Sequence, residues 1–328
     1  MDDPLIFVRA IHFAATLSVA GVVLFNIFIA QPALRPPAGT ELRAAIGQRL
    51  AWIGLIGLLL TLLSGAAWFV LVAESISDQP LASVLSDGSV LQSVLLDTDF
   101  GRDWLLRLLL IAILAGLLTA EQRGKLDGRG FLKFSVVIAA AGLAGTLAWA
   151  GHGIGGAGLP GSIHLAADFL HLIAAAAWVG GLLPLAMMLT AAGKASSFGV
   201  ARAASLRFSA YGIAAVGTLL LTGAINTWYL AGSIQALTAT DYGHLLLVKI
   251  ALFLIMVALA TVNRLRLTPR LVEAAGTRGV RDASRQLRRN VAIEIAAGVT
   301  ILAIVGALGV TPPGSEGQAM VQLHHRSR

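Results

Sequence analysis

The chain has 328 residues, of which 57% are hydrophobic and only 12% are charged, and its mean hydropathy is +0.81. Soluble domains carry about 25% charged residues, so this composition excludes a soluble globular protein and predicts an all-α protein that crosses a membrane several times. The chain contains no cysteine, which excludes disulfides and thiolate metal sites. Histidine, carboxylate, methionine and backbone oxygen are left as metal ligands.

Eight apolar segments are long enough to cross the lipid bilayer as helices, which takes about 20 apolar residues each. The first is not expected to be a cleaved signal peptide, because its leader is acidic and its apolar run is too long. The segments between the spans are mostly short, so we expect loops there and no appended soluble domain. The eight spans are expected at 5–31, 50–73, 104–120, 132–150, 163–190, 208–230, 244–263 and 291–310.

The net charge of +7 is spread unevenly. Most of the 24 lysines and arginines lie between spans one and two, three and four, five and six, and seven and eight. If the spans alternate in direction, these segments share one side, and the positive-inside rule places both termini on the periplasmic side. The basic surplus is therefore an orientation signal, and no nucleic-acid partner is expected. Trp68, Trp104, Trp149 and Trp228 lie near the outer ends of their spans, as in an aromatic belt.

The two halves of the chain repeat each other. His12 precedes Gly21 by the same spacing as His171 precedes Gly180. Two further sets of anchors recur in the same order, namely Arg49 and Gly65 with Arg207 and Gly223, and Asp99, Gly101 and Arg107 with Asp241, Gly243 and Lys249. We therefore expect two tandem four-helix halves of the same orientation, residues 1–153 and 154–312, followed by a periplasmic tail, 313–328.

Three ionisable residues stand out in the fifth span. His164, Asp168 and His171 are spaced i, i+4 and i+7, so they share one face of a helix. Such groups cost several kcal/mol in hydrocarbon unless they are paired, bind something or line water. Their chemistry and spacing suit a metal site, and the alternative is a polar trio that holds helices together.

The other histidines gather on the same side of the membrane. His12 and His171 each lie about eight residues below the outer end of a span, or ~12 Å deep at 1.5 Å per residue, and His152, His164 and His244 lie at span boundaries. We expect His12, His164, Asp168 and His171 to converge on one metal site. His152 and His244 are further candidate ligands, with helix capping as the alternative. His324 and His325 in the tail are candidates to capture metal.

Imidazole and carboxylate suit Cu(II), Zn(II), Ni(II) or iron, whereas Cu(I) prefers sulfur ligands. Met187, Met188 and Met256 could pass a softer ion inward, and core packing is the alternative role for each. No nucleotide-binding loop or other catalytic signature is present, so an enzyme is not expected. Asp168 and Glu294 are candidates to carry a coupling proton, and Glu294 is expected to pair with Arg264, Arg288 or Arg289.

The residues Asp168-x2-His171-x6-Trp178-Val179-Gly180-Gly181 resemble the central signature of the CopD/PcoD copper-resistance membrane proteins. The resemblance implies a multi-pass protein of the bacterial inner membrane that takes copper from the periplasm and serves copper transport, resistance and homeostasis. It also implies a separate periplasmic copper-binding partner of the CopC type. The match continues through Thr222-Gly223, Asn226, Tyr242-Gly243, Lys249, Asn263-Arg264, Pro269, Arg288-Arg289 and Glu294.

Two other functions remain open at this point. His12 and His171, at equal depth, could be the axial ligands of a haem, which would make the protein an electron carrier. The chain could also be a structural or sensory membrane component without a bound metal.

Overall fold

The computed structural model describes residues 3–35, 39–124, 130–150, 158–191, 198–273 and 276–313, and within these ranges it contains helices and no strand. Eight helical runs in the described part of the chain are long and apolar enough to cross a membrane, which confirms the expected number. They are Pro4–Ala33, Thr40–Ser77, Asp99–Gln122, Gly130–Ala150, Gly158–Thr190, Phe198–Ala231, Asp241–Glu273 and Arg278–Leu308.

The spans are built from longer and shorter helical elements. The first and the seventh span each contain a π-helical turn. In chain order the main elements are α1 (Pro4–Phe25), η1 (Asn26–Ala30), α2 (Gln31–Ala33), α3 (Thr40–Ser77), α6 (Asp99–Gln122), α7 (Gly130–Gly145), η2 (Thr146–Ala150), α8 (Gly158–Ala191), α9 (Phe198–Ala231), α11 (Asp241–Val262), η5 (Asn263–Leu267), α12 (Thr268–Glu273) and α13 (Gly276–Leu308). The short helices α4 (Leu81–Ser86), α5 (Gly88–Asp97) and α10 (Ile234–Ala239) connect spans.

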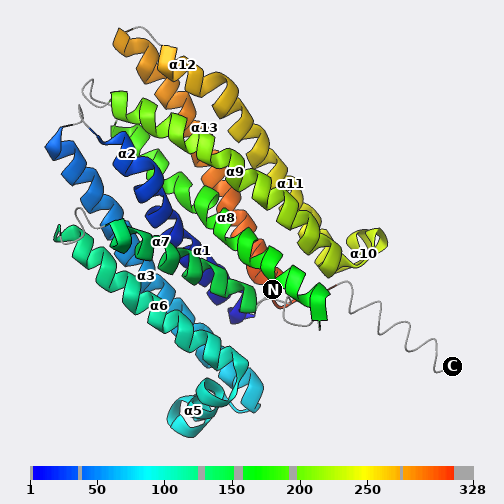
Figure 1. Cartoon of the computed structure of the whole chain (residues 1–328). Coiled ribbons are helices and arrows are strands. Elements are labelled where there is room, and N and C mark those ends of the chain that lie inside the picture. Colours follow the sequence, from blue (N-terminus) through cyan, green and yellow to red (C-terminus); the bar gives the residue numbers. More distant parts are fainter. Residues whose placement is uncertain are drawn as a thin grey trace.

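Helices α1 and α8 form the centre of the bundle and are its most buried spans (Figure 1). They cross where Gly21 meets Gly180. A Cβ atom on Gly21 would clash with the backbone of Gly180 and Ala176, and one on Gly180 would clash with the backbone of Leu17 and Gly21. Small residues let helix backbones approach closely in membranes, where there is no hydrophobic driving force between helices. The two glycines therefore fix the central crossing.

The remaining spans pack around this central pair. Helices α3 and α7 contact α1, and α6 packs against α3 and α7. Helices α9 and α13 contact α8, and α11 packs against α13. Further contacts link the groups, because α7 and η2 also touch α8, α13 also touches α1, and α9 also touches η1 and α2.

The described ends of the chain lie at one end of the bundle. Gly306 of α13 and Gly309, just after it, pack against Ile6, Arg9 and Ala10 of α1, and α5 and α10 lie toward the same end (Figure 1). We call this the terminal end. Helices α2 and α12 lie at the opposite end, which we call the basic end because Arg264, Arg266, Arg270 and much of the remaining basic sequence cluster there.

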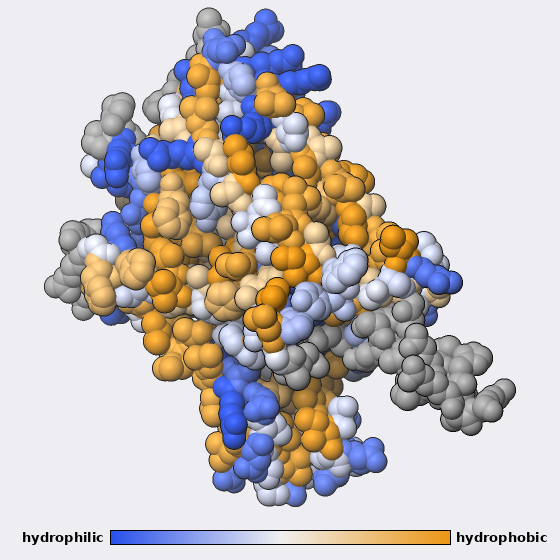
Figure 2. All heavy atoms as spheres, turned by 45° about the vertical axis from the view of Figure 1, so that its right-hand side comes forward, coloured by the Kyte–Doolittle hydropathy of each residue, from blue (hydrophilic) through white to orange (hydrophobic). Residues whose placement is uncertain are grey.

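The outer surface carries the apolar side chains that a membrane protein presents to lipid. Leu59, Leu221 and Ile255 are more than half exposed. Figure 2 shows a broad hydrophobic surface in the middle of the molecule, with hydrophilic residues concentrated toward its two ends. Such a surface is stable only in a lipid bilayer.

Two expectations about local structure were wrong. Trp68 and Trp104 are buried inside the bundle, 2% and 5% exposed, whereas Trp149 and Trp228 are 39% and 77% exposed, as a belt requires. The helix of the last span also begins earlier than expected, since α13 starts at Gly276 and its candidate span at Arg278 rather than at residue 291. Its first turns are amphipathic, since Val280, Ala283 and Leu287 are buried at helical spacing and hold this arginine-rich segment as a helix.

Candidate metal site

The candidate site is built around His171, which α8 directs toward α9. Its Nδ1 lies 2.9 Å from Thr222 Oγ1. The Thr222 hydroxyl donates its own hydrogen to the carbonyl oxygen of Thr218 at 2.6 Å, so it accepts from the histidine and Nδ1 carries the proton. The lone pair of the ring is then on Nε2. The hydrogen bond at one ring nitrogen thus prepares the other for a metal.

Oxygen donors lie beside this imidazole. Asp168, three residues earlier on α8, accepts a hydrogen bond at Oδ1 from Asn226 Nδ2 of α9, at 3.0 Å. The other amide atom, Asn226 Oδ1, is buried and has no hydrogen-bond partner among the described residues. A buried oxygen without a donor is unfavourable, and a cation would satisfy it. Imidazole nitrogen, carboxylate and amide oxygen fit a borderline divalent ion better than Cu(I).

A partly buried cationic side chain completes this group of residues. Lys249 of α11 lies close enough to interact electrostatically with Asp168 and His171, although no ion pair within 4 Å joins it to Asp168 among the described residues. Its ammonium group offsets the charge of Asp168 in low dielectric. A metal cation that binds Asp168 must therefore compete with Lys249.

The boundary histidines have other partners. His164 is buried and stacks on Tyr229, with ring centroids 5.1 Å apart. His244 is exposed, and its Nε2 lies 2.9 Å from the carbonyl oxygen of Thr238, which fits the capping alternative. The predicted ligand His152 and the tail residues His324 and His325 lie outside the described residues.

His12 lies in a different cluster, between α1, α3 and α6. Its Nδ1 is 3.1 Å from the carbonyl oxygen of Thr61 and 3.2 Å from Ser64 Oγ. Because a carbonyl can only accept, Nδ1 is the donor. The ring is fully buried, and Trp68 and Trp104 enclose it at centroid distances of 5.3 and 5.8 Å.

Positive charge surrounds His12. The guanidinium carbons of Arg9 and Arg107 lie 4.6 and 5.4 Å from the centroid of the Trp68 ring. The carboxylate in this cluster is Asp103, which pairs with Arg107 at 2.6 Å. Two guanidinium groups against one carboxylate make the cluster unfavourable for a metal cation.

The expected convergence of His12, His164, Asp168 and His171 on one point is not seen. Among the described residues, no three histidine, aspartate or glutamate side chains are placed to hold a metal ion. The reason lies in the central crossing. With α1 and α8 packed backbone to backbone through Gly21 and Gly180, each helix directs its histidine toward its own neighbour, α3 or α9. The axial-ligand pair that the haem alternative requires receives no support from this arrangement.

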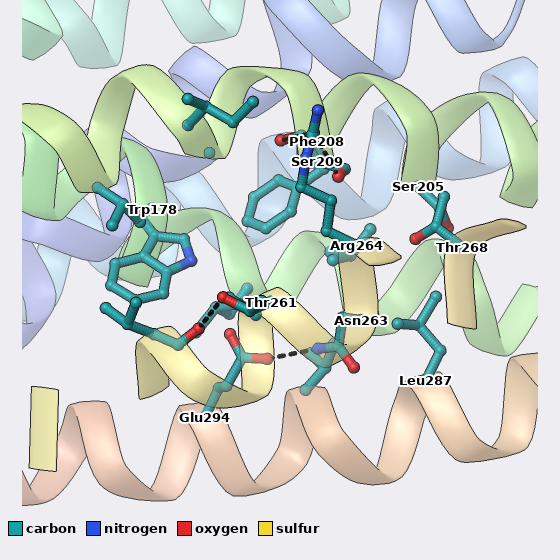
Figure 3. Close-up of a pocket in the computed structure, with 18 of the residues that line it drawn as sticks. Trp178, Ser205, Phe208, Ser209, Thr261, Asn263, Arg264, Thr268, Leu287 and Glu294 are labelled. Atoms are coloured by element: carbon teal, nitrogen blue, oxygen red, sulfur yellow. Dashed lines mark hydrogen bonds between the residues drawn. The ribbon is translucent and has the colours of Figure 1, made fainter. Parts of the chain in front are cut away.

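A second feature, which the sequence did not predict, is a cavity of about 320 Å³ between α8, α9, α11–η5 and α13, nearer the basic end (Figure 3). Glu294 lies in its wall, 1% exposed, and accepts a hydrogen bond from Asn263 Nδ2 at 2.6 Å. The expected pairing of Glu294 with an arginine is wrong. Arg264 donates instead to the backbone and hydroxyl oxygens of Ser209, both at 2.9 Å.

Comparisons with known proteins match both halves of this chain. The family model described as "Copper resistance protein D-like, N-terminal domain" matches residues 1–163, and the model "Copper resistance protein D" matches residues 202–308. Asn226 and Lys249 fall inside the second range, whereas Asp168 and His171 lie between the two. No solved structure matches the chain.

Three curated proteins are similar over large parts of the chain. Copper resistance protein D of Pseudomonas syringae pv. tomato is 30% identical, over 96% of this chain and 99% of that protein. Inner membrane protein YebZ of Escherichia coli is 29% identical, over 81% and 85%. Copper transport protein CutJ of Bacillus subtilis is 28% identical over 53% of this chain and 32% of its own length. The chain therefore belongs to the copper resistance protein D family and is a multi-pass protein of the inner membrane.

Proposed function

We propose that this protein carries copper across the inner membrane and binds it from the periplasmic side at Asp168 and His171. The observation that carries the proposal is the state of His171, whose Nδ1 is held as a donor to Thr222 and whose Nε2 therefore carries the lone pair. The partly buried carboxylate of Asp168 lies three residues earlier on the same helix. The names of two relatives, a copper resistance protein and a copper transport protein, support copper as the cargo. Transport rather than catalysis is the activity that this arrangement favours.

The periplasmic side in this proposal is the terminal end. The concentration of arginine at the basic end supports a cytoplasmic position for α2 and α12. Both termini are then periplasmic, together with α5 and α10. Copper that enters from the periplasm would reach His164 first. Asp168 lies about one helical turn deeper in the membrane, and His171 about two turns deeper.

We also propose that residues 1–153 and 154–312 are tandem repeats related by an axis along the membrane normal. Matched contacts support this. His12 contacts Ser64 as His171 contacts Thr222, and the Gly21–Gly180 crossing is reciprocal. The N-caps also match, since Thr98 Oγ1 accepts from the Gly101 amide as Thr240 Oγ1 accepts from the Gly243 amide, each at 3.0 Å.

In this proposal the two halves differ in function, because matched positions carry different charged residues. At the spacing that pairs His12 with His171, Arg9 pairs with Asp168, so the first half carries a guanidinium where the second carries a carboxylate. We therefore leave His12 out of the ligand set and propose that the copper site belongs to the second half alone. His152 stays a prediction, and His244 is a cap in this proposal.

A periplasmic copper-binding protein of the CopC type is the partner we propose for delivery at the terminal end. The tail, residues 313–328, is on that side in the proposed topology, and its His324 and His325 could take part in the transfer. The partner would transfer its copper ion to Asp168 and His171 from the terminal end.

The decisive experiment compares single variants in proteoliposomes supplied with copper. His171→Ala should lower copper uptake strongly while membrane insertion is unchanged, because it removes a ligand. Asp168→Ala should be milder if Asp168 only orients its neighbours, since loss of such a partner costs about 10–100-fold in affinity. His244→Ala, at an exposed cap, is the matched control and should behave as wild type. Wild-type copper uptake by a well-inserted His171→Ala protein would exclude the proposed site.

A further inference from the structure

The cavity near the basic end contains a carboxyl group with unusual partners. Its walls come mostly from apolar side chains such as Trp178, Leu182 and Phe208 (Figure 3). Glu294 projects from α13 into this wall, and Asn263 binds one of its oxygens. Asn263 is held in turn by Asn290, whose Nδ2 donates to Asn263 Oδ1 at 2.8 Å. Amide groups thus position the carboxyl group, and none of them carries charge.

No positive charge compensates Glu294. It takes part in no ion pair among the described residues. Of the charged residues on the packed elements, only Arg264 also lines the cavity, and its guanidinium group is bound to Ser209. Helix α1 beyond His12 and α8 beyond His171 contain no ionisable side chain. The packed elements carry further titratable residues, none of which lines the cavity: Arg202 and Arg207 on α9, Asp241, His244 and Lys249 on α11, Arg266 on η5, Arg270 and Glu273 on α12, and Arg278, Arg281, Asp282, Arg285, Arg288 and Arg289 on α13.

Electrostatics then decides which form of Glu294 is stable. An ionised carboxylate buried without a counterion is strongly unfavourable, whereas a protonated carboxyl group is a neutral hydrogen-bonding group. The cavity can admit water to Glu294, because about 320 Å³ exceeds the volume that one water needs and the lining includes the hydroxyl groups of Ser205, Ser209 and Thr261. The group can therefore hold a proton and also exchange it.

We propose that Glu294 is an exchangeable proton site inside this cavity and that it couples copper movement to proton movement. The coupling rests on the proposed transport function, whereas the proton site does not. Two helices connect the sites. Helix α8 carries both Asp168 and Trp178, and α11 carries both Lys249 and the cavity residue Val257. A copper ion that binds Asp168 near Lys249 would therefore act on the same two helices that enclose Glu294.

The proton site is tested by labelling with dicyclohexylcarbodiimide, an apolar reagent that reaches carboxyl groups from the membrane. The carboxyl proton moves to a nitrogen of the reagent and the carboxylate oxygen bonds its central carbon, after which the adduct rearranges to a stable N-acylurea. We expect peptide mapping of the wild-type protein to find this adduct on Glu294 at neutral pH and less of it as the pH is raised.

Glu121 supplies the matched control, because amide groups of Asn26 and Gln31 also donate to its carboxylate, at 3.1 and 3.0 Å. Glu121→Gln should leave the adduct on Glu294 unchanged, and Glu294→Gln should abolish it. Wild-type protein that carries no adduct on Glu294 at neutral pH would overturn the proton site, and this result needs no variant to fold.

Coupling is tested in proteoliposomes that enclose a pH-sensitive dye. Added copper should change the internal pH with wild-type protein and with Glu294→Asp, which keeps the carboxyl group. With Glu294→Gln, copper movement should no longer change the internal pH. An unaltered pH response in Glu294→Gln would refute the coupling. If wild-type liposomes took up no copper, the transport proposal would fail while the labelling result stood by itself.

Discussion

The orientation of a single hydroxyl controls the chemistry of His171. Thr222 is committed as a donor to Thr218, so it can serve His171 only as an acceptor. A methyl group in place of that hydroxyl would remove the acceptor and free the ring to turn or to exchange tautomers. Only a part of the protein molecules would then have the lone pair of His171 on Nε2 and the ring in the orientation that binds metal.

We therefore expect Thr222→Val to weaken copper binding by about 10–100-fold, the usual effect of losing the partner that orients a ligand. Thr222→Ser keeps the hydroxyl and should stay close to wild type. Titration of purified protein with copper in competition with a chelator measures the affinity. Equal affinities for the Val and Ser variants would show that the hydroxyl does not orient the ring.

At this scale the sequence predicted that His171 and Asp168 lie close together, and their role as ligands stays a prediction. It wrongly predicted that His12 converges with them. The spacing on one helix brings Asp168 and His171 together whatever the rest of the fold does. The position of His12 depends on how α1 turns around the Gly21–Gly180 contact, and Arg9 and Arg107 reach its cluster from two helices. Lys249 was visible as an ionisable residue within a span, the signal that should have added it to the candidate site.

Among the helices, the α1–α8 crossing needs a glycine on both sides, because each meets the backbone of the other helix. Gly21→Ala should destabilise the protein by roughly 1–3 kcal/mol or more, the cost of forcing atoms into a filled core, because its Cβ would overlap the backbone of Gly180. Gly116→Ala in α6 is the control, since a Cβ there meets nothing within 4 Å. Thermal unfolding in detergent should show a lower melting temperature for the first variant only. Equal melting temperatures would mean that the crossing can relax.

The eight spans were predictable because apolar length is a strong signal, whereas α5, α10 and α12 were not. These helices are short, and their apolar residues pack against neighbours that only the fold supplies. Val94 of α5, for example, is buried in a small cluster with Phe69 and Trp104. The early start of α13 was missed for a related reason, since its arginines conceal the buried stripe of Val280, Ala283 and Leu287.

On the scale of the whole molecule, the histidine of the first span and the histidine of the fifth span have different surroundings. The first half places two guanidinium groups and two tryptophans around His12, and the second places a carboxylate, an amide and an ammonium around His171. The charges around His171 thus favour a metal cation more than the charges around His12 do. The cavity with Glu294 lies on the side of the molecule that holds the metal-compatible cluster.

The orientation of this whole arrangement in the membrane is the last testable point. A reporter enzyme active only in the periplasm should be active when fused after residue 313 and inactive when inserted after Glu273, at the end of α12. The physical reason is that arginines near the ends of spans are retained on the cytoplasmic side, and α12, η5 and the start of α13 are rich in them. A reporter active only in the cytoplasm, placed at the same two points, should give the reverse pattern. Periplasmic activity at Glu273 would show that the protein has the opposite orientation in the membrane. Asp168 and His171 would then lie toward the cytoplasm, and copper uptake from the periplasm through them would be excluded.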